Sequence, residues 1–281
     1  MEFTYSLNDT PIVTRVEGEI VYGEPRALLS EDDDLTAGTP WADRGYVVTD
    51  FLPAERLETL REGILQRIVK VLDDAGLRPP ADFTMETYHR FAAQDERVHP
   101  VVVEWFGRGF PLESLPIDYH LVERRIGEIV GAEVTAHNKA YGLDVFNMRV
   151  VRPHSNDNNP LHRDVWLDRL RNAVNIYVPI AGSDERSSLC LVPGSHRWQE
   201  SEIARTAAGA LVNGLPYTVP AVVGAKYPLN LIRPNPSPGQ VLVFSPYLIH
   251  GGAANLNENV TRVSLEMRFW RAHGRSSAPS A

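Results

Sequence analysis

The stretch Asn159-Pro-Leu-His-Arg-Asp164 places a histidine and a carboxylate two residues apart, directly after a loop rich in Asn and Pro. On an extended strand, alternate side chains face the same side, so His162 and Asp164 are expected to point into one cavity. A third ligand is expected at His250, which follows an apolar run and precedes two glycines. One carboxylate and two imidazoles on one face of a metal leave the opposite positions open, and this is the ligand set of non-haem Fe(II) oxygenases.

Short apolar segments surround these ligands and predict the fold. From about residue 133 onward, segments rich in Val, Ile, Phe and Tyr alternate with Gly, Pro and Asn. This spacing suits an antiparallel barrel or a double-sheet jelly roll. Residues 201–215 are expected to form a helical insertion or a loop. The expected strands are 143–152, 162–166, 173–180, 188–192, 218–223, 239–245 and 261–270.

The N-terminal part of the chain has mainly helical periodicity. A short strand is expected within 45–52, and Pro53 then starts a helix whose apolar residues recur at three- and four-residue spacing. A second helix is expected at about 112–131, with loops and short helices between the two. Residues 1–40 look irregular, and the acidic run Glu31–Asp34 is expected to be solvated surface or a mobile loop, because adjacent acids repel one another.

These patterns predict a mostly β protein with N-terminal helices and a double-stranded β-helix core of the jelly-roll or cupin-like kind. We expect a single domain over residues 1–281. It would comprise a helical N-terminal part and lid at 1–132, the jelly-roll core at 133–272 and a flexible tail at 273–281.

The charge and composition of the chain limit the kinds of partner that we expect. A formal net charge of -8 provides no basic field for phosphate backbones, so nucleic acid is not an expected partner. No apolar run has the length of a membrane span and the N-terminus lacks a secretory pattern, so a cytoplasmic protein with no membrane partner is expected. The single cysteine, Cys190, lies in an apolar run and is expected to be a buried thiol. Monomer and homodimer both remain open.

A conspicuous arginine follows the last expected ligand. Arg262 and Ser264 lie two residues apart on an expected strand and therefore share a face with each other. An inward arginine is costly to bury without a partner, whereas a carboxylate would be held by its guanidinium fork. With a metal beside it, this pair suggests a 2-oxo acid cosubstrate. Its 2-oxo carboxylate end would chelate the metal, and its far carboxylate would meet Arg262 and the Ser264 hydroxyl.

Four stretches together resemble the phytanoyl-CoA hydroxylase-like (PhyH) family of Fe(II)/2-oxoglutarate-dependent dioxygenases. They are 45–52 with the helix after it, Leu161–Asp164, Leu191–His196, and His250 with Arg262. The resemblance spans roughly residues 45–270 and implies Fe(II), 2-oxoglutarate and O2, with release of succinate and CO2.

By position, the resemblance implies that His162, Asp164 and His250 bind iron and that Arg262 binds the distal carboxylate of 2-oxoglutarate. Asn175 resembles a strand position that helps to hold this cosubstrate, and Asn147 is a weaker candidate. Family members that halogenate replace the metal-binding carboxylate with a small residue. Because Asp164 is present, hydroxylation or a related oxidation of a small-molecule substrate is expected.

Substrate contacts are inferred from strand alternation. Arg149 shares a face with Asn147, and Trp166 follows Asp164 by two residues, so both are expected beside the metal, while Arg163 should point out of the barrel or into a lid. An Arg–Trp pair suits a polar or anionic small metabolite with some planar surface. Alternatively, Trp166 belongs to the core and Arg149 pairs with an acid such as Asp144.

Two other functions compete with the oxygenase. A non-catalytic jelly-roll protein that binds a metabolite or sugar would explain the barrel, but not the coincidence of the ligands with Arg262. A cupin-type metalloenzyme that uses Mn, Ni or Zn without a 2-oxo acid would also leave Arg262 unexplained. His196, in the turn Pro193–His196, is expected to be structural rather than a ligand.

Overall fold

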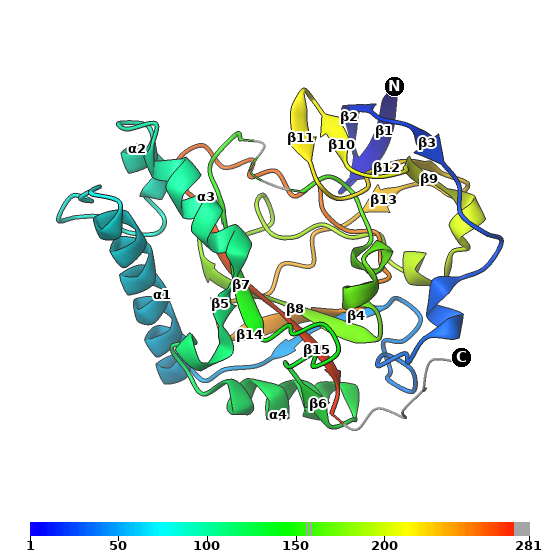
Figure 1. The fold of residues 1–281 in the computed structure, drawn as a ribbon, viewed down its shortest axis with the longest axis horizontal. Coiled ribbons are helices and arrows are strands. Elements are labelled where there is room, and N and C mark those ends of the chain that lie inside the picture. The colour runs from blue at the N-terminus through cyan, green and yellow to red at the C-terminus, as the bar shows by residue number, and fades with distance from the viewer. Residues whose placement is uncertain (156, 158, 273–281) are drawn as a thin grey trace.

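The computed structural model describes residues 1–155, 157 and 159–272, and within them the protein is mostly β with four α-helices (Figure 1). The α-helices are α1 (Ala54–Asp74), α2 (Tyr88–Ala92), α3 (Val98–Arg108) and α4 (Tyr119–Val130). The 3-10 helices are η1 (Leu28–Glu31), η2 (Leu112–Ser114), η3 (Asp164–Trp166), η4 (Asp168–Leu170), η5 (Ser195–Arg197) and η6 (Glu200–Glu202). The expected tail, 273–281, lies outside the described residues.

The strands form three sheets. One has the order β4-β14-β8-β15-β7-β5 with β6 paired to β15, the second is β11-β10-β2-β1-β13, and the third is β12-β9-β3. The strands are β1 (Glu2–Leu7), β2 (Thr10–Glu17), β3 (Ile20–Val21), β4 (Tyr46–Asp50), β5 (Phe110–Pro111), β6 (Val134–Thr135), β7 (Val145–Val151), β8 (Ala173–Ala181), β9 (Ile203–Thr206), β10 (Ala210–Val212), β11 (Leu215–Tyr217), β12 (Val222–Ala225), β13 (Asn230–Leu231), β14 (Gln240–Phe244) and β15 (Arg262–Arg271).

Strand β15 separates the apolar core from a polar cavity. Val263, Leu265, Met267 and Phe269 are buried in the core cluster that also contains the apolar faces of α1, α3 and α4. The alternate residues, among them Arg262, Glu266 and Arg268, line the cavity on the other face. Because side chains alternate along a strand, one face of β15 packs in the core and the other lines the cavity.

Helix α1 covers the core face as its apolar periodicity predicts. Six of its apolar residues are buried, and each contributes about 1.5–3 kcal/mol relative to an exposed side chain. Helix α4 begins at Tyr119 rather than near 112, because Pro116 interrupts the segment and Asp118 caps the new start by accepting from the backbone N–H of His120. Figure 1 shows these helices at the opposite end of the molecule from β1–β3.

The prediction that residues 1–40 are irregular is wrong for the first half of this segment. Strands β1 and β2 form a hairpin whose turn residues, Asn8 and Asp9, both have positive φ. Such a turn matches the twist of the flanking strands and favours Asn and Asp. The same reason overturns the helical insertion or loop expected at 201–215, where Asn213-Gly214 joins β10 to β11.

The acidic run lies at the surface, as expected, but ion pairs hold it to the rest of the protein. Asp32 accepts from Arg171 Nε at 2.7 Å and from the Tyr247 hydroxyl, and Asp33 pairs with Arg271 Nε at 2.7 Å. These contacts tie the N-terminal segment to residues near the ends of β8 and β15. The repulsion among adjacent acids is offset by arginines that are distant in sequence.

Two expected strands are replaced by isolated backbone bridges. Residues 162–166 contain a bridge from His162 to His250, followed by the 3-10 turn η3. Residues 188–192 contain only bridges from Leu191 to Ile232 and to His250. Both segments contain residues that favour strands, but only one residue of each segment forms a backbone bridge.

Candidate metal centre and cosubstrate pocket

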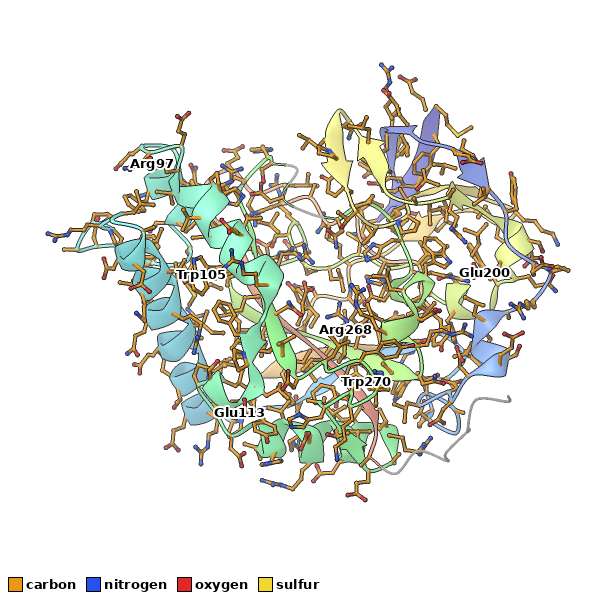
Figure 2. All side chains as sticks on the ribbon, viewed as in Figure 1. Arg97, Trp105, Glu113, Glu200, Arg268 and Trp270 are labelled. Atoms are coloured by element: carbon orange, nitrogen blue, oxygen red, sulfur yellow. The ribbon has the colours of Figure 1, made fainter. Side chains whose placement is uncertain are left out.

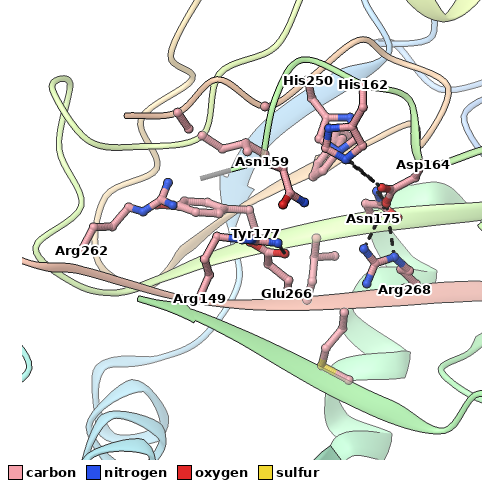
Figure 3. Close-up of a pocket in the computed structure, with 16 residues that line it drawn as sticks. Arg149, Asn159, His162, Asp164, Asn175, Tyr177, His250, Arg262, Glu266 and Arg268 are labelled. Carbon is pink, nitrogen blue, oxygen red and sulfur yellow. Dashed lines mark hydrogen bonds and ion pairs between the residues drawn. The ribbon is translucent and has the colours of Figure 1, made fainter. Parts of the chain in front are cut away.

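His162, Asp164 and His250 meet at one end of a buried cavity (Figure 3). The Oδ1 atom of Asp164 lies 3.3 Å from Nε2 of His162 and 3.7 Å from Nε2 of His250. One atom from each residue lies within 4.8 Å of the others, and all three side chains are buried. The structure therefore brings together the three residues that the sequence proposed as ligands.

Backbone pairing positions the two imidazoles. The backbone N–H of His162 donates to His250 O at 2.9 Å, and the N–H of His250 donates back at 3.0 Å. Gly251 allows the chain to continue, with φ at +110° and with Pro160 O only 2.2 Å from where a Cβ would lie. A side chain at this position would displace the loop that carries His162.

Each imidazole turns the same ring nitrogen, Nε2, toward Asp164. The Nδ1–H of His162 donates to Pro160 O at 2.8 Å, and that of His250 donates to Leu248 O at 2.9 Å. Because a carbonyl only accepts, the proton must sit on Nδ1, and Nε2 carries its lone pair toward Asp164. Burial lowers the pKa of His250 to about 4, which keeps this ring neutral at physiological pH.

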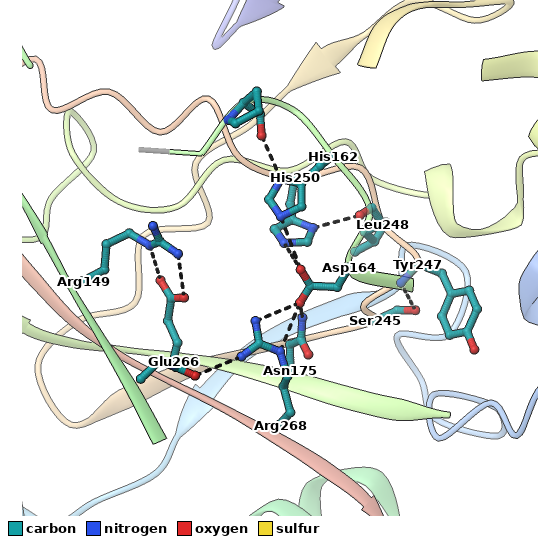
Figure 4. A network of polar contacts seen from close by, with 12 residues as sticks. Arg149, His162, Asp164, Asn175, Ser245, Tyr247, Leu248, His250, Glu266 and Arg268 are labelled. Carbon is teal, nitrogen blue, oxygen red and sulfur yellow. Dashed lines mark hydrogen bonds and ion pairs between the residues drawn. The ribbon is translucent and has the colours of Figure 1, made fainter. Parts of the chain in front are cut away.

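Arg268 is the residue at this centre that the sequence reasoning missed. Its Nη2 lies 3.1 Å from Oδ2 of Asp164, and Asn175 Nδ2 donates to the same oxygen at 2.9 Å (Figure 4). Burial alone would raise the pKa of Asp164, but the guanidinium of Arg268 holds it well below its ordinary value. The alternation Arg262, Ser264, Glu266, Arg268 along the strand was the available signal.

Arg262 lies at the far end of the same cavity, across from the three ligands (Figure 3). It is 1% exposed, and its Nη1 donates to Ser187 O at 3.0 Å. In the described part of the chain, the buried Arg262 Nε and Ser264 Oγ have no hydrogen-bond partner. Unpaired buried donors are costly, so this end fits an incoming carboxylate.

Arg149 and Asn147 project from β7 on the cavity side. Arg149 Nε donates to Glu266 at 3.1 Å, so its acidic partner is Glu266 on β15 rather than Asp144. Burial alone would raise the pKa of Glu266, but the guanidinium of Arg149 more than offsets this effect, and the pKa lies below its ordinary value. Asn147 Oδ1 accepts from Arg268 Nη1 at 3.4 Å.

The expected inward orientation of Trp166 is wrong. Residues 164–166 form a 3-10 turn with a period near three, so side chains two apart do not share a face. The Trp166 indole donates to Glu200 at 2.8 Å and faces Arg205, and it does not line the metal cavity. Figure 2 shows Glu200 well to the right of Arg268.

Arg163 lines neither cavity, and it is not exposed to solvent either. Its guanidinium is fully buried, pairs with Glu200 and donates to Ser195 O. His196, expected to be structural, is buried and donates from Nε2 to Ala42 O at 2.9 Å. Cys190 is buried as predicted.

A second cavity of about 440 Å³ adjoins the first. It shares Arg149, His162, Asp164 and Arg268 with the inner cavity, so the candidate ligands face both. Its outer wall includes Val102 and other residues of α3. This volume lies in the range of about 300–1,000 Å³ typical of small-molecule sites.

The family model described as phytanoyl-CoA dioxygenase (PhyH) matches residues 41–264. The chain belongs to this family. It is an Fe(II)/2-oxoglutarate-dependent oxygenase, and its cofactor and cosubstrates are Fe(II), 2-oxoglutarate and O2. Family membership favours the oxygenase over a non-catalytic binding protein or a metalloenzyme without a 2-oxo acid.

Solved structures give a likeness of fold. A non-heme monooxygenase, ThoJ in its apo form, is 12% identical with a TM-score of 0.51, and the match covers 85% of this chain and 77% of that chain. EctD from S. alaskensis with 2-oxoglutarate and 5-hydroxyectoine is 15% identical with a TM-score of 0.48, covering 92% and 84% of the two chains. The comparison with curated proteins returned no match.

Within residues 1–155, 157 and 159–272, no helix combines the length and the apolar character that a membrane crossing requires.

Proposed function

We propose that this PhyH oxygenase hydroxylates a C–H bond of a small, polar metabolite while 2-oxoglutarate is converted to succinate and CO2. One observation carries the proposal. A single buried cavity has three candidate metal ligands at one end and Arg262 at the other. Arg262 Nε, and Ser264 Oγ two residues further along β15, have no hydrogen-bond partner in the described part of the chain. A dicarboxylic 2-oxo acid would satisfy both ends at once.

Each end of the cavity has its own task. His162, Asp164 and His250 would hold the iron, which together with O2 and 2-oxoglutarate supplies the oxidising power for the C–H bond. Arg262 and Ser264 would bind the distal carboxylate of 2-oxoglutarate and so orient it toward the metal. The burial of these side chains keeps bulk water away and strengthens their charged contacts.

Asn175 and Asn147 would support the cosubstrate only indirectly. Asn175 donates from Nδ2 to Asp164. Its buried Oδ1 has no hydrogen-bond partner in the described part of the chain. Asn147 contacts Arg268. Both asparagines would therefore act through Asp164 and Arg268 rather than by direct contact with 2-oxoglutarate.

The second cavity would receive the substrate. Apolar residues of α3 and β7 form much of its wall, while Arg149 and Glu266 place charged groups near the ligands. A metabolite with a polar group directed at these residues would carry its reacting C–H bond beside the metal. Trp166 has no place in this site.

We also propose that the isolated bridges His162–His250 and Leu191–Ile232 belong to the second sheet of a double-stranded β-helix. This sheet would face the one containing β8 and β15, with the cavity between them. Residues 1–281 would then form one dioxygenase domain, in which the N-terminal helices back the first sheet.

A labelling experiment tests the hydroxylation. Small polar metabolites are screened with Fe(II) and 2-oxoglutarate for succinate release, and any hit is repeated under ¹⁸O2. A product that gains one labelled oxygen atom supports hydroxylation. A product that loses two hydrogens without gaining oxygen would contradict it, and Asp164→Ala serves as the control without turnover.

A further inference from the structure

The two carboxylate oxygens of Asp164 have different surroundings. Oδ1 faces Nε2 of His162 at 3.3 Å and Nε2 of His250 at 3.7 Å. Oδ2 points the other way and accepts from Asn175 Nδ2 at 2.9 Å and from Arg268 Nη2 at 3.1 Å and Nε at 3.3 Å (Figure 4). One oxygen is therefore turned toward the candidate metal position, and the other is held by three N–H donors.

The sheet itself fixes the two residues that hold Oδ2. Asn175 on β8 and Arg268 on β15 are direct partners across the antiparallel pair, so their side chains emerge side by side. The third nitrogen of the guanidinium, Nη1, donates to Asn147 on β7. With each of its nitrogens engaged, Arg268 is better explained as support for Asp164 than as a free anchor for substrate.

We propose that Arg268 and Asn175 are positioning residues that hold Oδ2 of Asp164 and so restrict this carboxylate to one metal-ligating oxygen. The inference rests on the proposed metal site. A chelating carboxylate would take two adjacent positions on the metal and compete with 2-oxoglutarate for them.

The test uses Co(II), whose visible absorption reports its coordination number, in place of Fe(II). Arg268→Met removes the charge and the hydrogen bonds while it keeps much of the volume. Arg268→Lys keeps the charge. Arg271→Met is the matched control, because Arg271 lies on the same strand but pairs with the exposed Asp33. Metal affinity, the absorption spectrum and 2-oxoglutarate affinity are measured for each folded protein.

We expect Arg268→Met to bind Co(II) about 10–100-fold more weakly, as is typical when a residue supporting a metal ligand is lost. Its spectrum should shift, and the metal-loaded variant should need more 2-oxoglutarate for saturation. Arg268→Lys should be intermediate, and Arg271→Met should match wild type. A folded Arg268→Met protein with wild-type spectrum and affinities would overturn the inference.

If Arg268→Met does not fold, Asn175→Ser removes one donor and should shift the spectrum in the same direction, whereas an unchanged spectrum overturns the proposal. Failure of wild type to bind Co(II) would overturn the metal site itself. Normal binding in wild type together with unaltered variants would overturn only the role of Arg268 and Asn175.

Discussion

At the scale of single residues, backbone carbonyls determine how the two histidines of the candidate metal centre are oriented. Pro160 O and Leu248 O accept hydrogen bonds from the Nδ1–H groups of His162 and His250, so both Nε2 atoms could bind a metal. A conventional sequence motif gives the ligand types but not this tautomer. The same reasoning applies to Arg262, whose unpartnered Nε becomes meaningful only once its burial is known.

Replacement of Arg262 by Met should weaken 2-oxoglutarate binding. Truncating one partner of a buried charge-assisted pair costs about 2 kcal/mol or more, which corresponds to about thirtyfold or more in Kd. Calorimetric titration of 2-oxoglutarate into the Mn(II)-loaded protein measures it, with Arg271→Met as the control. Equal affinities of Arg262→Met and wild type would show that the distal carboxylate binds elsewhere.

Cys190 should be inert in the folded protein. Burial raises the pKa of its thiol to about 11, so almost no thiolate exists at pH 8, and the side chain is fully covered. A disulfide exchange reagent should therefore label no thiol in the native protein and one thiol after denaturation. Rapid labelling of the native protein would contradict the burial of this strand-like segment.

The metal-free protein should lose stability as the pH falls from about 6.5 to 4. The pKa of His250 is lowered by burial to about 4, so over this window the unfolded chain binds a proton that the folded chain excludes. The free energy of unfolding should fall by up to about 3 kcal/mol on this account. Denaturant unfolding at several pH values measures it, and His250→Gln should have a shallower slope than wild type over the same range.

At the scale of elements, the sequence predicted regular segments better than irregular ones. The helix after Pro53 and the strands β7, β8, β14 and β15 follow from their apolar periodicity. The segment 162–166 was wrongly predicted as a strand, because one bridge and a 3-10 turn replace it. His162 and Asp164 still converge, whereas Trp166 turns away. The local sequence cannot predict this change from strand to 3-10 turn, since it depends on pairing with residues near 246–250.

The N-terminal hairpin illustrates a missed local signal. Asn8-Asp9 and Asn213-Gly214 are turn pairs that favour positive φ, and both lie between strand-forming residues. Recognition of these pairs would have predicted β1–β2 and β10–β11. The pairing of Asp32 with Arg171 could not have been predicted, because it joins segments far apart in the chain.

Gly251→Ala should destabilise the connection between the two histidines. A Cβ there would lie 2.2 Å from Pro160 O, and φ of +110° is unfavourable for any other residue. We expect a loss of roughly 1–3 kcal/mol or more, together with weaker metal binding. Gly142→Ala, with φ of +61° and open space, isolates the backbone strain. Equal melting temperatures for the two variants would contradict the proposed clash.

At the scale of the whole molecule, strands β8 and β15 lie between the helix-covered core and the cavity that holds the candidate ligands. The inner cavity extends from the three ligands to Arg262, and the outer cavity opens toward α3. Since both cavities share the ligand residues, cosubstrate and substrate would approach the metal from different sides. On the proposed function, this arrangement would separate cosubstrate binding from substrate selection.

The central claim is that His162, Asp164 and His250 hold iron beside 2-oxoglutarate, with its distal carboxylate on Arg262. Its most direct test is an anaerobic titration of the metal-free protein with Fe(II) and then 2-oxoglutarate, followed in visible absorption. We predict a weak charge-transfer band of the iron–2-oxoglutarate chelate in wild type and none in His250→Ala. Bound iron without any such band in the wild-type protein would contradict the claim.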